Sequence, residues 1–324
     1  MNDPSHERRM FIKRMGAAAG FAAGTAAVGT WFHNRNLVPS GEVAKVIPSF
    51  AVPGTEGMMV VAEGTDHALA VRAALQELGG IERFVKAGDR VLIKPNCAFD
   101  RPAHLGATTS PAVTGEVVRQ CIAAGAQVRV IDNPINNPEG CFVKSGLMDA
   151  VGAAGGDVWL PSTSLFGQVK VGTLRIPEWE ALYRPLDWAD KLIGIPTVKT
   201  HNLSGATLTM KNWYGLLGGP RNRLHQAINE VIADLAQFIR PTLVVLDGSR
   251  LLVSNGPTGG SPSDARPGHV VAAGTDQVAI DCFGARLLGL DPQDIAYLGM
   301  AKELGLGVLS EENLKLFKKV KAVS

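Results

Sequence analysis

Short apolar segments alternate along this chain with longer amphipathic ones, and this alternation limits the possible folds more than any other feature. The apolar segments are residues 58–62, 90–94, 127–132, 191–196, 242–247 and 270–273. The amphipathic segments are residues 66–78, 110–124, 139–151, 224–239 and 275–288. Strands that alternate with helices at this spacing predict an α/β fold, a doubly wound and mostly parallel sheet with helices on both faces.

The remaining segments define the expected domain organisation. Residues 36–57 are rich in Pro, Gly and Ser, which indicates a linker. We expect one α/β domain over residues 58–305, with a small β insertion near residues 157–190, where Pro and Trp interrupt the alternation. Residues 306–324 are expected to form a C-terminal helix.

The N-terminus has the layout of an export signal. Arg8 and Arg9 are followed by Phe11, Ile12 and Lys13, and an uncharged stretch rich in Ala and Gly then runs over residues 15–28. A basic region, an apolar region and a return to polar residues are typical of a signal peptide. The paired arginines resemble the twin-arginine motif. We therefore predict residues 1–35 to be a twin-arginine signal peptide or anchor.

This signal predicts a partner and a location. The chain should meet the twin-arginine translocation machinery and work in the periplasm or another extracytoplasmic compartment. The apolar stretch is marginal in length for a membrane span, so cleavage and retention as an inner-membrane anchor both stay open. Because this route exports folded proteins, a cofactor would enter during folding in the cytoplasm.

The charge balance argues against nucleic-acid binding, and the cysteine spacing argues against a local metal-binding motif. Beyond residue 40 the chain has 27 basic and 28 acidic residues, which is no electrostatic footprint for nucleic acid. The four cysteines show no C-x-x-C spacing, so a local zinc or iron–sulfur motif is absent. Cys121 and Cys282 lie in apolar helical patterns and are expected in the core. Cys97 and Cys141 follow strand-like segments, and a disulfide between them is one expectation.

Polar side chains follow four of the predicted strands at the point where each strand ends. They are Lys94 and Asn96, then Asp132, then Lys199 and His201, and finally Asp247. In open α/β sheets, ligands bind in a crevice beyond the carboxyl ends of the strands. We therefore expect these side chains to share one crevice.

Three further segments are expected at that crevice. Thr108 and Thr109 precede a helix N-terminus, whose free N–H groups favour an anion. Lys211 and Asn212 lie beside a glycine-rich turn, and Asn255 begins a Gly-rich loop over the crevice. Neither the phosphate-binding G-x-x-x-x-G-K-[ST] order nor the dinucleotide G-x-G-x-x-G order is present.

The residue types suggest roles for this set. Lysines would hold a carboxylate, phosphate or other anionic group, while carboxylates and a histidine would act as acid and base or bind a metal ion. The expected ligand-binding residues are Lys94, Asn96, Thr108, Thr109, Lys199, Lys211, Asn212 and Asn255. The expected catalytic residues are Asp132, His201 and Asp247. Asp132 and Asp247 are also the candidate metal ligands, with a divalent metal ion favoured over an iron–sulfur cluster as cofactor.

Several motifs together resemble the family called domain of unknown function 362. They are V-L-I-K-P-N at 91–96, G-A-T-T-S-P at 106–111, V-K-T-H at 198–201, T-L-T-M-K-N at 207–212, L-D-G at 246–248, N-G-P-T-G-G at 255–260 and A-G-T-D-Q-V-A-I-D at 273–281. The resemblance spans roughly residues 58–305. Some members of this family carry a ferredoxin-like segment with clustered cysteines, so the resemblance implies an association with iron–sulfur chemistry. This chain lacks that segment. The family's reaction is not established.

Three functions stay open at this point. The first is an exported enzyme that acts on a small anionic substrate. The second is a non-catalytic cofactor-binding or maturation protein, which serves an exported redox enzyme as its partner. The third is an electron-transfer protein that holds an iron–sulfur cluster through Cys97 and Cys141 with other ligands.

Overall fold

A mixed sheet of mostly parallel strands forms the centre of the computed structural model, which describes residues 43–322. The strands are β1 (Met58–Glu63), β2 (Arg90–Pro95), β3 (Gln127–Val130), β4 (Asp157–Val158), β5 (Gly167–Lys170), β6 (Glu178–Ala181), β7 (Lys191–Ile195), β8 (Thr197–His201), β9 (Gly205–Thr207), β10 (Leu243–Leu252), β11 (Ala265–Gly274) and β12 (Leu316–Lys321). The expected twin-arginine segment, residues 1–35, lies outside the described residues.

The strand order of this sheet is β12-β1-β11-β10-β7-β2-β3-β4. Strand β8 follows β7 in the chain and also pairs with β10, and β9 pairs with β8. Strands β10, β7, β2, β3 and β4 pair in parallel. Strand β11 runs antiparallel to both of its neighbours, β1 and β10. The predicted α/β class with a mostly parallel sheet is confirmed, and the parallel strands place their carboxyl ends at one edge.

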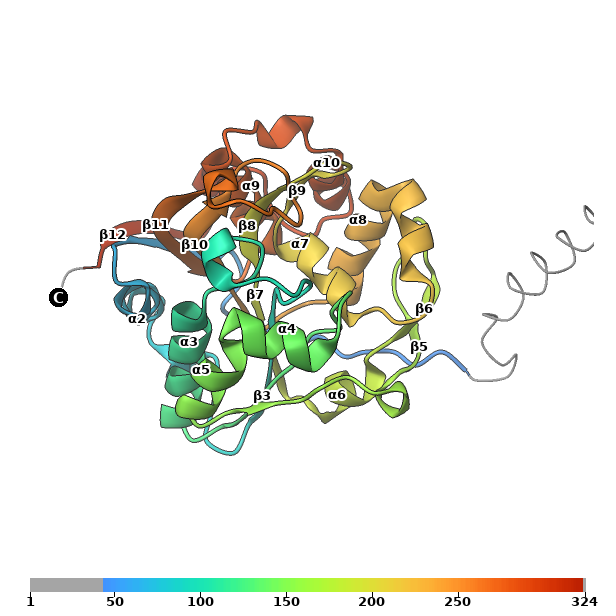
Figure 1. The fold of residues 1–324 in the computed structure, drawn as a ribbon, viewed down its shortest axis with the longest axis horizontal. Helices are drawn as coiled ribbons and strands as arrows, with labels where there is room; N and C mark the ends of the chain where they lie inside the picture. The colour runs from blue at the N-terminus through green and yellow to red at the C-terminus, as the bar shows by residue number, and fades with distance from the viewer. Residues whose placement is uncertain (1–42, 323–324) are drawn as a thin grey trace, which may run out of the picture. The chain divides into compact units, whose positions relative to one another are not determined.

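Helices cover both faces of the sheet, as Figure 1 shows for α2, α3 and α5 on one side and α8 and α10 on the other. The helices are α2 (His67–Glu77), α3 (Pro111–Ala123), α4 (Pro138–Ser145), α5 (Leu147–Ala153), α6 (Tyr183–Trp188), α7 (Thr209–Asn212), α8 (Ile228–Phe238), α9 (Gln277–Leu287) and α10 (Ala296–Glu303). No helix in residues 43–322 has the length and apolar character that a membrane crossing requires.

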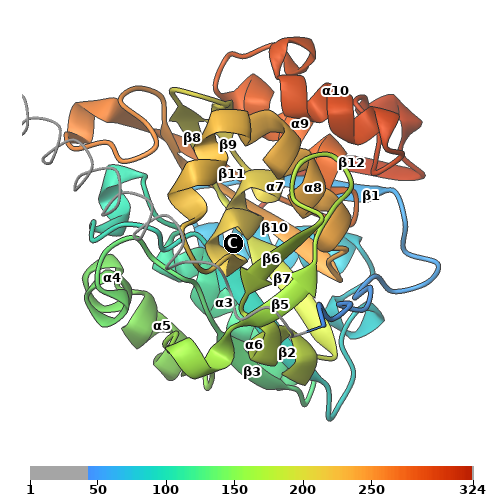
Figure 2. The same ribbon diagram turned by 90° about the vertical axis from the view of Figure 1, so that its right-hand side faces the viewer.

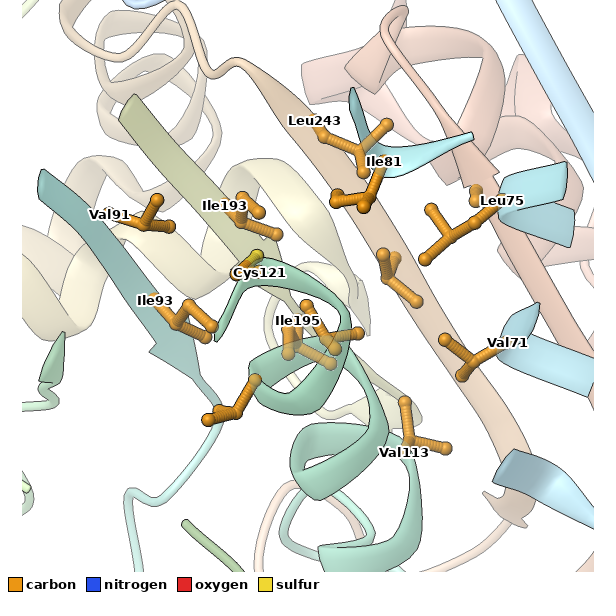
Figure 3. Close-up of a cluster of buried hydrophobic side chains, with 14 of the residues drawn as sticks. Val71, Leu75, Ile81, Val91, Ile93, Val113, Cys121, Ile193, Ile195 and Leu243 are labelled. Atoms are coloured by element: carbon orange, nitrogen blue, oxygen red, sulfur yellow. The ribbon is translucent and has the colours of Figure 1, made fainter. Parts of the chain in front are cut away.

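Each face of the sheet has a hydrophobic core, because the side chains of a strand point alternately to the two faces. Val91 and Ile93 of β2 point to the face under α2 and α3, and Figure 3 shows them in one cluster with Ile193, Ile195 and the α3 residues Cys121 and Val113. Leu92, between them, belongs to the core on the opposite face. Because strand side chains alternate, one apolar run supplies both layers.

The small β insertion expected near residues 157–190 is present as an antiparallel pair of β5 and β6 (Figure 2). Asp234 of α8 fixes the turn of this hairpin. Its carboxylate accepts backbone hydrogen bonds at 2.7–2.9 Å from four consecutive residues, 173–176. One buried carboxylate therefore satisfies four N–H groups that the turn leaves without partners.

The two ends of the described chain differ from the expected linker and helix. The predicted C-terminal helix at residues 306–324 is wrong, because Leu316–Lys321 forms β12, which pairs in parallel with β1 and satisfies the hydrogen bonds of that strand. Residues 43–57 of the expected linker pack against the domain. Ile47 and Phe50 are buried there, and the Phe50 N–H donates to the Arg240 carbonyl.

Candidate functional site

A small cavity of about 90 Å³ lies beyond the carboxyl ends of β2, β3 and β8 and beside α7. We call it the basic cavity. It is lined by Lys94, Asn96, Ala98, Phe99, Asp132, Asn133, Ile135, Lys199, His201, Thr207, Lys211, Asn212, Tyr214, Gly215, Arg221, Asn222, His225 and Pro257. The crevice expected at the strand ends therefore exists, and seven of the predicted site residues line it.

A buried ion pair forms one wall of the basic cavity. Lys94 Nζ lies 2.7 Å from Asp132 Oδ1, and both side chains are 1 % exposed. The Asp132 carboxylate also accepts hydrogen bonds from the backbone N–H groups of Cys97 and Asn133. Burial lowers the pKa of Lys94, and the Asp132 carboxylate opposes that shift. Asp132 is thus held in place by three donors.

Two asparagines, Asn96 and Asn212, connect this ion pair to Lys199 of β8. Asn212 Oδ1 accepts hydrogen bonds from Lys94 Nζ at 2.9 Å and from Asn96 Nδ2 at 3.1 Å. Asn96 Oδ1 in turn accepts a hydrogen bond from Lys199 Nζ at 2.9 Å. The network joins β2, α7 and β8, so these polar groups share one rigid arrangement.

Lys199 lines the basic cavity, and its side chain is buried. Its Nζ donates to Asn96 Oδ1 and to the Ala107 carbonyl at 2.7 Å, and lies 5.0 Å from the centre of the Phe99 ring. Burial, helped by the nearby Lys211 charge, lowers the pKa of Lys199 to about 7. This lysine therefore exchanges its proton near neutral pH.

Lys211 differs from the other lysines in its partners. It comes from α7, whose first two N–H groups, those of Thr209 and Met210, donate to the buried Asp281 carboxylate. Its Nζ lies 4.5 Å from the centre of the Tyr214 ring, and within residues 43–322 it makes no hydrogen bond or ion pair. Burial, with the charges of Arg221 and Lys94, lowers its pKa to about 7.

His201 is a neutral imidazole with one defined tautomer. Its Nδ1 accepts hydrogen bonds from the N–H groups of Leu203 and Ser204, which leaves the proton on Nε2. Burial lowers its pKa to about 3, and the charge of Lys211 adds to the shift. His225 stacks on it with ring centres 6.3 Å apart. His201 therefore contributes an N–H donor rather than a cation.

Arg221, Tyr214 and His225 line the basic cavity without having been predicted. The Arg221 guanidinium donates to four backbone carbonyls, those of Asn133, Pro134, Tyr214 and Leu217. Burial lowers the pKa of Arg221 from its ordinary value. The nearest sequence signal is the glycine-rich turn that ends in Gly218 and Gly219, just before Arg221.

Asp247 does not belong to the basic cavity. Strand β10 continues past it to Leu252, so Asp247 lies within the strand and not at its end. Its side chain follows Leu243 and Val245 to the face covered by α3, and its Oδ2 accepts the Ser110 N–H at 2.6 Å. The anion expected at this helix N-terminus is therefore the protein's own carboxylate.

Three other predicted ligand-binding residues also lie elsewhere. Thr109 Oγ1 accepts a hydrogen bond from the Asn96 N–H and donates one to the Ile195 carbonyl. This side chain therefore holds the backbone of a cavity residue in place without lining the cavity. Thr108 is buried, and its hydroxyl has no hydrogen-bond partner in residues 43–322. Asn255 Nδ2 donates to Asp264, and only Pro257 of its loop lines the cavity.

The donor set does not fit the predicted divalent metal site. Asp132 is occupied by Lys94 and two backbone donors, and Asp247 lies on the other face of the sheet. Across residues 43–322 no three His, Cys, Asp or Glu side chains are grouped so that they could hold a metal ion. The arrangement favours an anion over a cation at this position.

The four cysteines are buried free thiols, so the disulfide expected between Cys97 and Cys141 is not formed. Cys97 Sγ faces Ser145 Oγ at 3.8 Å instead. Burial raises the pKa of Cys141 to about 11 and raises that of Cys97 as well. Since iron–sulfur clusters are held by thiolates, these two protonated thiols are poor ligands for one.

Comparisons with known proteins agree on one family. The model of the family "domain of unknown function (DUF362)" matches residues 91–286, a segment that contains the strands and α7 around the basic cavity. A thylakoid-associated protein from Synechocystis sp. is 27% identical over 259 residues, which cover 75% of this chain and 76% of that protein. No solved structure matches the chain.

Proposed function

This chain belongs to the DUF362 family, and we propose that it binds a compact anion in the basic cavity. Four cationic side chains line that cavity, Lys94, Lys199, Lys211 and Arg221, against the single carboxylate of Asp132. Buried charges are stable only when they are paired, so this excess of positive charge calls for a negative partner.

The observation that carries the proposal is the position of Lys211. Its amine is in a side chain only 8% exposed, yet it has no hydrogen-bond acceptor. Lys94 and Lys199 each have at least two acceptors from the protein. An anion in the cavity would supply the acceptor that Lys211 lacks and would raise its pKa.

The cavity limits the size of this anion. Its volume of about 90 Å³ is smaller than the roughly 150 Å³ cavity that accepts benzene. Phosphate, sulfate and short carboxylates fit this limit, and a longer ligand could extend past the exposed Asn222 at the rim. The bound group is therefore small, with its charge facing the lysines.

The same arrangement supports proton transfer on such a ligand. His201 presents an Nε2–H donor, and Lys199 and Lys211 gain or lose a proton near neutral pH. General acids and bases work best when their pKa lies near the working pH. Asp132, which the sequence suggested as catalytic, acts instead as the fixed counter-ion of Lys94.

A titration with simple anions tests binding. Isothermal titration calorimetry with phosphate, sulfate and oxalate should show binding to the full-length chain and a large loss in Lys211→Met. Lys302→Met, which removes an exposed lysine on α10, is the matched control and should bind as the parent does. Equal binding by Lys211→Met, or no binding of any of these anions, would sink the proposal.

We further propose that the chain is exported through the twin-arginine route and works outside the cytoplasm. The support is the pair Arg8-Arg9 and the uncharged stretch that follows it. The similar protein from Synechocystis sp. is named as thylakoid-associated, which agrees with a location of this chain at a membrane. Replacing both arginines by lysine should hold the protein in the cytoplasmic fraction, and unchanged fractionation would contradict export by this route.

A further inference from the structure

Lys211 differs from Lys94 and Lys199, which also line the basic cavity, in that its amine makes no hydrogen bond in the part of the chain that the structure describes. Its amine faces the basic cavity, it makes no hydrogen bond within residues 43–322, and its contact is the face of the Tyr214 ring. An amine in this position does not have to break a bond with the protein before it reacts. Lys94 would have to leave Asp132 and Asn212, and Lys199 would have to leave Asn96 and Ala107.

We propose that Lys211 forms an imine with a compact oxo acid, a ligand that carries a carbonyl group beside its carboxylate. This inference rests on the proposed anion-binding function, because the carboxylate is the anion that the other cations hold. The neutral amine adds to the carbonyl carbon, so a C–N bond forms and the carbonyl oxygen becomes a hydroxyl. That hydroxyl holds one of the two amine hydrogens, and it leaves as water with the second one. The C–O bond breaks and a C=N bond, the imine, remains.

The surroundings of Lys211 supply the groups that this reaction needs. Lys199 and Arg221 line the same cavity; the Arg221 charge lowers the pKa of Lys211, and the Lys211 charge lowers the pKa of Lys199. A carboxylate held between Lys199 and Arg221 would therefore lie close to Lys211. His201 lines the cavity as a neutral Nε2–H donor, so it can hydrogen-bond to the hydroxyl as it leaves. The proton that completes the water molecule comes from the amine nitrogen, and the histidine keeps its own.

The protonation state of Lys211 agrees with this role. Only a neutral amine attacks a carbonyl, and buried lysines near other cations are the ones that lose their proton at neutral pH. In the free protein, where its pKa is about 7, Lys211 is mostly neutral at pH 7.5. An ordinary exposed lysine with a pKa of about 10.4 then has roughly several hundred times less neutral amine.

Reductive trapping tests the inference directly. The full-length chain is incubated with pyruvate and sodium cyanoborohydride at pH 7.5, and the adduct is located by peptide mass spectrometry. We expect a single adduct on Lys211, roughly tenfold or more above any exposed lysine such as Lys302. Lys302→Met, which removes an exposed lysine outside the cavity, should keep the adduct on Lys211, whereas Lys211→Met should lose it.

Two comparisons separate this inference from the proposed function. Oxalate has carboxylates but no ketone, so its binding by calorimetry reports the anion site alone. If oxalate binds and pyruvate is not trapped, imine formation is wrong while anion binding stands. If neither occurs, both are wrong. Acetone lacks a carboxylate, and equal trapping of acetone and pyruvate, or adducts spread evenly over exposed lysines, would overturn the oxo-acid assignment.

Discussion

Lys94 Nζ and Asp132 Oδ1 lie 2.7 Å apart in a pair where each side chain is 1 % exposed. The pair joins the end of β2 to the segment after β3 and forms one wall of the basic cavity. Removing one member of a buried pair leaves the other charge without a partner, at a cost of about 3–5 kcal/mol. We therefore expect Asp132→Asn to lower the free energy of unfolding by roughly this amount, as measured by urea denaturation.

The double variant Lys94→Met with Asp132→Asn is the control for that prediction. It removes both charges, so much of the loss should be recovered relative to Asp132→Asn alone. If the loss of stability in the double variant equals the sum of the losses in Asp132→Asn and Lys94→Met, the two residues are not coupled.

The close approach of Gly215 to this pair gives a second prediction. A Cβ at position 215 would lie 2.0 Å from Asp132 Oδ1 and 2.6 Å from Lys94 Nζ, both inside contact distance. Gly215→Ala should therefore separate the two charges and weaken both folding and sulfate binding, measured by urea denaturation and calorimetry. Gly299→Ala is the matched control, because no atom lies within 4 Å of its Cβ in α10. It should change stability by no more than about 1 kcal/mol, in the stabilising direction.

Two lysines of the cavity could be predicted because each follows a strand signal. Lys94 ends an apolar run of β2, and Lys199 lies in a short strand after another. Parallel strands bring such ends to one edge, so residues more than a hundred positions apart meet. Lys211 follows no strand signal, and its position beside a glycine-rich turn is what predicted it at the same crevice.

Asp247 shows where this reasoning fails. A strand's end and the face of each side chain both depend on its neighbours, and β10 is extended to Leu252 by its pairing with β11. Asp247 therefore points under α3 with Val245, while Lys94 points to the opposite face with Leu92. Arg221 was missed for another reason, since it lies in the 3-10 segment Arg221–Ala227 just before the amphipathic pattern that begins at residue 224.

The third prediction concerns the stability cost of the cavity lysines. Folding lowers the pKa of Lys199 and Lys211 from 10.5 to about 7. Between these two values the unfolded chain binds more protons than the folded one, so stability rises with pH, by up to about 1.4 kcal/mol per pH unit for each lysine. Below pH 7 both states are protonated and this contribution to the slope disappears.

Lys211→Met should therefore be more stable than the parent at pH 7 and should have a shallower slope between pH 7 and 10. Urea denaturation in a buffer free of multivalent anions measures both quantities. Lys302→Met on the surface should keep the parental slope. A parent whose stability falls over this pH range would contradict the lowered pKa values.

The fourth prediction is confined to the hairpin of β5 and β6. Asp234→Asn removes the charge that accepts four backbone N–H groups at residues 173–176. Hydrogen bonds to charged groups contribute about 1.5–3 kcal/mol each, and part of this should be lost. Hydrogen exchange at residues 173–176 should accelerate, while the exposed Asp157→Asn control stays unchanged. Unchanged exchange in Asp234→Asn would show that this carboxylate does not hold the turn.

The last prediction joins anion binding to proton uptake. Sulfate keeps its charge between pH 6 and 9, so any change in its affinity over this range comes from the protein. Lys199 and Lys211 must be protonated to attract it, and above pH 7 they are increasingly neutral in the free protein. The affinity should therefore fall as pH rises, by up to about tenfold per pH unit for each proton taken up.

Calorimetry in two buffers with different ionisation enthalpies measures that proton uptake directly. Lys211→Met should bind sulfate more weakly and take up fewer protons, because one of the two titrating amines is gone. His201→Gln should keep the parental pH dependence even where its affinity is lower, since His201, with a pKa of about 3, is neutral throughout this range. An affinity that is flat between pH 7 and 9 would mean that the anion does not bind beside these two lysines.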